Sequence, residues 1–166
     1  REGYFNRVRT CDHASGVWSA PTTLDQGVDN HARGVMTVDP EGYLHVVLGG
    51  HGSAVSWCRS LQPNDSSEWT EAREIGVGTY PSLQCAADGT LFLTLRGHGE
   101  GRHLRGVDFY RRRPKGEWEA PRRIVRLAEE YGQAYAGFPM QMAIARDGTI
   151  PTIIEFFEGE DDHGRG

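Results

Sequence analysis

The stretch EWTEAREI at residues 68–75 recurs as VWSAPTTL at residues 17–24 and as EWEAPRRI at residues 117–124. Each copy carries one tryptophan: Trp18, Trp69 and Trp118. Successive tryptophans are 51 and 49 residues apart, and an aliphatic residue follows six positions after each of them. A fixed period near this length is typical of repeat folds in which each repeat is one supersecondary unit. The sequence therefore predicts a repeat protein.

The segments that flank each copy predict short strands. Before each copy lies a short aromatic and basic segment: YFNR at 4–7, SWCR at 56–59 and FYRR at 109–112. After each copy comes an apolar segment, a turn with Asp and Gly, and a second apolar segment; the turns are DPEG at 39–42, DG at 88–89 and DG at 147–148. Asp-Gly between two apolar runs is a strong hairpin signal. Each repeat therefore reads as four antiparallel strands.

Four short strands in a period of about 50 residues are the pattern of propeller blades. We predict an all-β chain in which residues 1–166 form part of a β-propeller. The predicted units are the end of one blade at 1–24, whole blades at 31–75 and 80–124, and the start of another at 138–157. Propellers use about four to eight blades. Because these are only about three blade-equivalents, we expect the remaining blades of the same protein as partners.

Charge and composition narrow the function classes. The formal net charge is −5, which argues against a nucleic-acid partner, and no apolar run is long enough to span a membrane. Lys115 is the only lysine, so local basic sites are made of arginine, whose planar fork suits carboxylate and sulfate groups. The three cysteines, Cys11, Cys58 and Cys85, are irregularly spaced and predict neither a disulfide framework nor a metal pair.

The predicted topology brings chemically active residues to one end of the blades. In a blade, the start of the first strand and the end of the second meet at the same face, where ligands usually bind. The residues at this mouth are the segments 29–31, 49–51, 79–81, 96–98 and 135–138, together with Glu155. They include histidines, tyrosines and an arginine, and each repeat offers a different residue type there.

The stretch from Asp29 to Ser60 carries a family resemblance. Its motifs DNHARG, VDPEGYLHV, GGHGS and WCRS resemble the BNR-repeat group related to sialidases, and within it the seven-bladed propeller polysaccharide lyases such as ulvan lyases. A further match is Tyr-Pro at 80–81, followed by arginine 16 residues after the tyrosine. The resemblance implies that catalysis is shared by His31, His51, Tyr80 and Arg96. It also implies a sugar-contacting role for Tyr135, to which we add Arg33 and His98 at the same mouth.

Lyase chemistry suits these residue types. The resemblance implies β-elimination on a uronate-containing, anionic polysaccharide by a secreted or periplasmic enzyme. A uronate C5 proton is weakly acidic, and a guanidinium such as that of Arg96 can stabilise the negative charge that develops on the carboxylate. Histidine and tyrosine can then serve as base and acid. This scheme requires no metal, although His98, His103 and the acidic segment 158–163 leave a structural zinc or calcium ion open.

Two other functions remain open from the sequence. A glycoside hydrolase of sialidase type would use clustered arginines with a tyrosine–carboxylate pair, and Arg33, Arg96 and Glu155 supply part of such a set. A sugar-binding propeller without catalysis would use the same mouth. Tyr80 and Arg96 could also have purely structural roles. Tyr80 would then pack on a blade wall, and Arg96 would form an ion pair between blades. For His45, which lies mid-strand, we predict packing.

Overall fold

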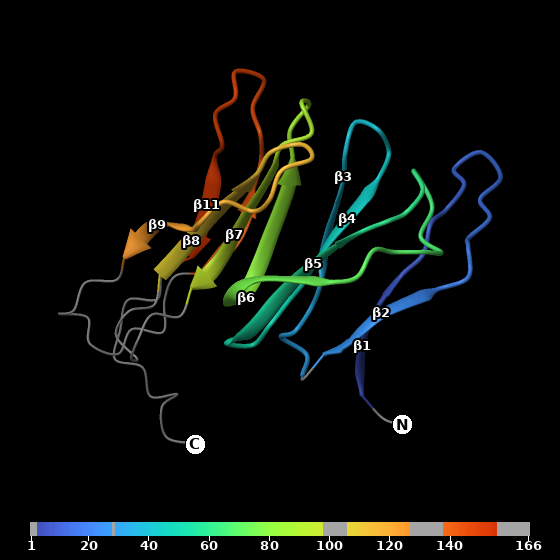
Figure 1. Cartoon of the computed structure of the whole chain (residues 1–166), viewed down its shortest axis with the longest axis horizontal. Coiled ribbons are helices and arrows are strands. Elements are labelled where there is room, and N and C mark those ends of the chain that lie inside the picture. Colours follow the sequence, from blue (N-terminus) through green and yellow to red (C-terminus); the bar gives the residue numbers. More distant parts are fainter. Residues whose placement is uncertain (1–2, 28, 98–105, 127–137, 156–166) are drawn as a thin grey trace.

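The computed structural model describes residues 3–27, 29–97, 106–126 and 138–155, and these residues form strands and turns without a helix. Eleven strands follow one another (Figure 1): β1 (Tyr4–Val8), β2 (Thr22–Gly27), β3 (Val35–Val38), β4 (Leu44–Leu48), β5 (Ser53–Arg59), β6 (Arg73–Cys85), β7 (Leu91–Gly97), β8 (Gly106–Arg112), β9 (Arg122–Arg126), β10 (Phe138–Met142) and β11 (Thr152–Glu155). The prediction of an all-β chain is therefore confirmed. Within the described ranges, no helix is long and apolar enough to cross a membrane.

All strand pairs are antiparallel and join strands that are neighbours in sequence. Strands β3 to β9 form one seven-stranded sheet, while β1–β2 and β10–β11 are separate hairpins. The two hairpins flank the large sheet on opposite sides (Figure 1). This meander places every second connection at the same end of the sheet.

The Asp-Gly turns form the hairpins that the sequence predicts. In each, an aspartate Oδ1 accepts a backbone N–H a few residues later: from Tyr43 to Asp39 at 2.9 Å, from Thr90 to Asp88 at 2.9 Å and from Thr149 to Asp147 at 2.9 Å. The turn glycines have φ of 89°, 83° and 85°, a region that side chains rarely adopt. These turns therefore fix β3–β4, β6–β7 and β10–β11.

The repeated tryptophans occupy equivalent positions. Each forms an isolated antiparallel bridge with a residue at or shortly after the end of the preceding aromatic and basic segment: Cys11 with Trp18, Ser60 with Trp69 and Arg112 with Trp118. Trp69 and Trp118 are partly buried and pack against apolar clusters. Trp18, by contrast, is 54% exposed. The elements described next to it supply no apolar cluster comparable to those of the other two.

The boundary between the predicted units at 31–75 and 80–124 differs from our expectation of two separate strands. Strand β6 is continuous from Arg73 to Cys85 and pairs with β5 along its first part and with β7 along its second. Gly78 pairs with both Ser53 and Gly97. No turn separates the two parts of β6. A bulge between Thr79 and Ser82 changes the direction of the strand.

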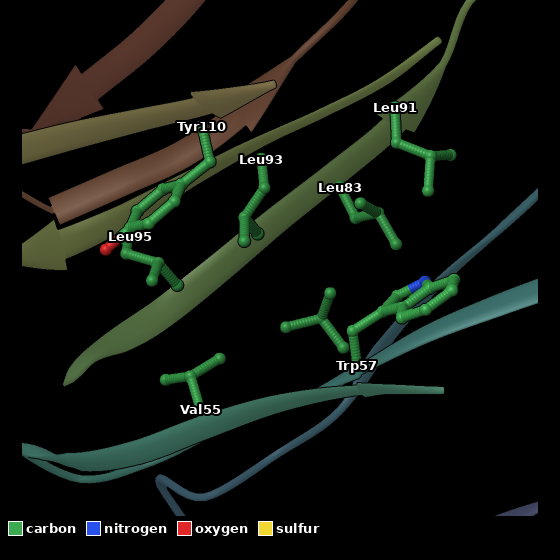
Figure 2. Packing of buried hydrophobic residues seen from close by; sticks show 8 residues of the cluster. Val55, Trp57, Leu83, Leu91, Leu93, Leu95 and Tyr110 are labelled. Atoms are coloured by element: carbon green, nitrogen blue, oxygen red, sulfur yellow. The ribbon is translucent and has the colours of Figure 1, made fainter. Parts of the chain in front are cut away.

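The main core lies between the two halves of the large sheet. Leu91, Leu93 and Leu95 alternate along β7, so their side chains share one face and are 0% exposed. They face Val55 and Trp57 of β5 (Figure 2). A second cluster of Val46, Leu48 and Cys58 packs against the β1–β2 hairpin through Val8 and Leu24. Two apolar interfaces thus hold successive repeats face to face.

His45 is part of this packing, as the sequence predicts. It is 3% exposed and stacks on Trp57 with ring centroids 5.7 Å apart. The Trp57 indole donates to His45 Nδ1 at 3.2 Å, so Nε2 carries the proton and donates to Asp39 at 3.1 Å. Burial lowers the pKa of His45 despite the nearby Asp39 carboxylate. His45 is therefore a neutral structural histidine whose two ring nitrogens are both occupied.

Candidate active site

The turn before β3 presents His31. Asp29 begins this turn, and its Oδ1 accepts the His31 backbone N–H at 2.7 Å, an arrangement that aspartate favours in turns. Asn6 of β1 holds the next residues, because its amide donates to the Ala32 carbonyl at 3.0 Å and accepts the Gly34 N–H at 2.8 Å. The His31 segment is therefore tied both to its own turn and to the neighbouring hairpin.

The β4–β5 connection presents His51 beside it. Gly49 precedes the histidine because a side chain there would collide with the backbone of Arg33. The Gly52 N–H donates to Thr79 Oγ1 at 2.9 Å, which ties this connection to β6. His51 Nδ1 lies 2.5 Å from Asp29 Oδ2, and the rings of His31 and His51 are 4.5 Å apart with a 32° tilt. The two histidines are thus neighbours, as the predicted topology requires.

Tyr80 lies on the bulge of β6. Its φ is 55°, an unusual value for a residue with a side chain. The next residue is Pro81, which has no N–H to donate and is compatible with a bulge. The Tyr80 ring meets the His31 ring edge-on, with centroids 6.1 Å apart. The bulge therefore directs the phenol toward the histidines, a role that bulges often have beside functional sites.

Arg96 completes the group from the end of β7. It is 2% exposed, and its guanidinium carbon lies 4.8 Å from the centroid of the Tyr80 ring. Thr79 and Arg96 are directly paired in the β6–β7 ladder, which places the guanidinium beside the bulge. A buried guanidinium can offer a fixed positive charge and a bidentate fork to a carboxylate.

The structure thus brings together the four side chains for which the sequence predicts catalysis. His31 contacts both His51 and Tyr80, and Tyr80 contacts Arg96. Arg33 lies exposed two residues beyond His31, with its backbone against Gly49. His98 and Tyr135 lie outside the described residues, as do His103 and the segment 158–163. The convergence is a structural fact, whereas the catalytic roles stay predictions.

The sequence places Asp29 at the mouth but assigns it no role there. Its carboxylate faces both histidines, at 2.5 Å from His51 Nδ1 and 3.4 Å from His31 Nδ1. The His31 backbone N–H and the His51 ring hold the pKa of Asp29 below its usual value. Asp29 is thus an ionised acceptor that places the His51 proton on Nδ1 and leaves Nε2 with a lone pair. The sequence signal for this role was an aspartate two residues before a histidine that is predicted to lie at the mouth.

Comparison with known proteins defines the class. Residues 6–153 match the BNR repeat-containing family, and the chain belongs to this family. A curated ulvan lyase of Pseudoalteromonas sp. (strain PLSV) is 29% identical over 121 residues, which cover 57% of this chain and 24% of the relative. The ulvan lyase of Alteromonas sp. (strain LOR) is 30% identical over 121 residues, with 57% and 25% covered. The chain thus spans about a quarter of the length of these relatives.

A solved structure shares the fold. It is described as a PL25 ulvan lyase bound to -[GlcA(1-4)Rha3S]-, and it superimposes with a TM-score of 0.61 at 19% identity over 94% of this chain and 38% of its own. This likeness supports a propeller-like all-β fold. Together with the family match, it confirms the resemblance to BNR-repeat polysaccharide lyases inferred from the sequence.

Proposed function

We propose that this chain carries the catalytic mouth of a polysaccharide lyase that cleaves a uronate-containing polymer by β-elimination. The observation that carries the proposal is the contact chain from His51 through His31 and Tyr80 to Arg96. This chain supplies two imidazoles, a phenol and a buried cation at one mouth. The similarity to ulvan lyases supports the same reaction class.

The reaction divides among these groups as follows. Arg96 binds the uronate carboxylate and stabilises the negative charge as the C5 proton leaves. A base takes that proton, the C5–H electrons form the C4=C5 double bond, and the C4–O4 bond breaks. An acid protonates the departing O4, so protons and electrons balance. His31, His51 and Tyr80 share the base and acid roles, and His51 Nε2 has the free lone pair that a base requires because Nδ1 faces Asp29.

The substrate is an anionic polysaccharide in this proposal. The buried positive charge of Arg96 selects a sugar that carries a carboxylate. We assign further sugar contacts to Arg33, His98 and Tyr135. Because a polymer of this kind cannot enter a cell intact, we propose a secreted or periplasmic location. The elimination needs no metal ion in this scheme.

Further blades complete the mouth in this proposal. We propose that strands β3–β5 with the first part of β6, and the second part of β6 with β7–β9, are two blades of a seven-bladed ring, although they share one continuous sheet here. Strand β1 pairs only with β2, and β11 only with β10, so each has one open edge among the described strands. Trp18 is exposed, whereas its equivalents Trp69 and Trp118 pack against apolar clusters. Additional blades of the same protein would cover these surfaces.

The test is an analysis of products from ulvan and other uronate-rich polysaccharides. A lyase releases a 4,5-unsaturated uronate that absorbs in the ultraviolet, and we expect this product from the protein expressed from its complete reading frame. A hydrolase would release reducing ends without that absorbance, and a lectin would bind polymer and release neither. Either of those results across a broad panel would replace the lyase proposal.

A further inference from the structure

Asp29, His31 and His51 have the composition and spacing of a transition-metal site. Each offers one ligand atom, and these atoms lie within 4.8 Å of one another. We propose that the three side chains bind Zn²⁺ or a similar divalent transition metal, and that the bound ion inhibits the enzyme because it occupies both histidines. The binding stands on this geometry alone, whereas the inhibition rests on the lyase function proposed above.

Two distances from Asp29, one from each carboxylate oxygen to a histidine, can be compared with what zinc requires. Zinc–nitrogen and zinc–oxygen bonds of about 2.0–2.1 Å in a tetrahedral site separate neighbouring ligand atoms by roughly 3.3 Å. Asp29 Oδ1 and His31 Nδ1 are already 3.4 Å apart. Asp29 Oδ2 and His51 Nδ1 are 2.5 Å apart and would separate by roughly 0.8 Å as the ion replaces the proton between them. The side chains can move, since they are 35–42% exposed.

The ligand set selects the kind of metal. Two imidazoles and one carboxylate suit zinc, nickel or copper, whereas calcium and magnesium prefer oxygen ligands. Three protein ligands leave the fourth position open to water. The ion would take the Nδ1 lone pair of each imidazole, and the ring proton of each histidine would then sit on Nε2. Neither histidine could then accept a proton from a sugar. Binding would therefore compete with catalysis.

The other histidine–aspartate pair of the described structure shows why this site is special. His45 also contacts an aspartate, at 3.1 Å from Asp39. Its second ring nitrogen accepts a hydrogen bond from Trp57, and the pair is buried, so no nitrogen is available to a metal.

The cysteines are the other side chains to consider in a zinc titration. Cys58 has its thiol pKa raised to about 11 by burial, whereas Cys11 is exposed. The protein used in a zinc titration should therefore lack the exposed Cys11 thiol.

The experiment is a calorimetric titration with zinc chloride of the Cys11→Ser protein, with and without Asp29→Asn. Asparagine keeps the side-chain oxygen that accepts the His31 N–H, so the turn should persist, and circular dichroism with a thermal midpoint checks this. The matched control is Asp65→Asn, because Asp65 accepts the Ser67 N–H at 2.8 Å in a similar turn and has no histidine contact in the described structure. We expect Asp29→Asn to lose one zinc equivalent or bind it at least tenfold more weakly, while Asp65→Asn binds as before.

A second arm measures lyase turnover of the protein from its complete reading frame with zinc and then with EDTA. We expect zinc to suppress product formation and EDTA to restore it. Unchanged zinc stoichiometry and affinity in folded Asp29→Asn would overturn the site, whether or not the protein is a lyase. Full activity with the site saturated would overturn the inhibition. Absence of activity in metal-free protein would count against the lyase function alone, since the titration judges the site independently.

Discussion

Replacing Leu93 by alanine tests the core between the two halves of the large sheet. Leu93 is 0% exposed on β7 and belongs to the cluster that includes Val55, Trp57 and Tyr110 (Figure 2). The substitution removes three buried carbon atoms, which at about 0.8 kcal/mol each amounts to roughly 2.4 kcal/mol. The unfilled cavity adds to this, so we expect a loss of about 3–4 kcal/mol in the free energy of unfolding.

The assay is urea unfolding followed by tryptophan fluorescence, with Trp57 as a reporter inside the cluster. Leu61→Ala is the matched control, because Leu61 is 42% exposed and should lose less than about 1 kcal/mol. Equal m-values would show that both variants unfold from comparable native states. A Leu93→Ala loss no larger than that of Leu61→Ala would refute the proposed interface.

Other predictions address the site and its surroundings. Asp29→Asn should lower lyase turnover about 10- to 100-fold with little change in KM, by analogy with the loss of groups that orient metal-bound histidines. Initial rates of formation of the ultraviolet-absorbing product would measure this. Tyr80→Phe should lower turnover while the thermal midpoint stays within a few degrees of the parent, which differential scanning calorimetry would check. Because burial holds the folded-state pKa of His45 below its unfolded value of about 6.5, its stabilisation is complete above that pH and declines as the pH falls through the folded value. Urea midpoints from pH 8 to pH 5 should fall accordingly, and His45→Gln should flatten this decline.

The sequence predicted the repeat, the hairpins and the gathering of His31, His51, Tyr80 and Arg96. These followed from local signals, because Asp-Gly turns and strand alternation fix topology without knowledge of distant contacts. The same topology then decides which strand ends meet. The exposure of Trp18 could not be predicted in this way, because it depends on what covers each repeat.

Two features of the site depend on tertiary geometry. The positive φ of Tyr80 is not encoded by tyrosine itself, and it arises where β6 changes partners from β5 to β7. The role of Asp29 depends on the position of the His51 ring, 22 residues away, which turn chemistry around Asp29 does not determine. Such side-chain geometry is a tertiary property, and sequence spacing indicates only which residues can approach one another.

The most direct test of the central claim is the product released from ulvan by the protein expressed from its complete reading frame, compared with its Arg96→Ala variant. We expect an unsaturated uronate, detected by ultraviolet absorbance and mass spectrometry. We also expect turnover to fall by several orders of magnitude in the variant, since removing one group that stabilises developing charge costs about 3–4 kcal/mol. Unsaturated product formed at the parent rate by Arg96→Ala, or polymer bound without any such product, would contradict this claim.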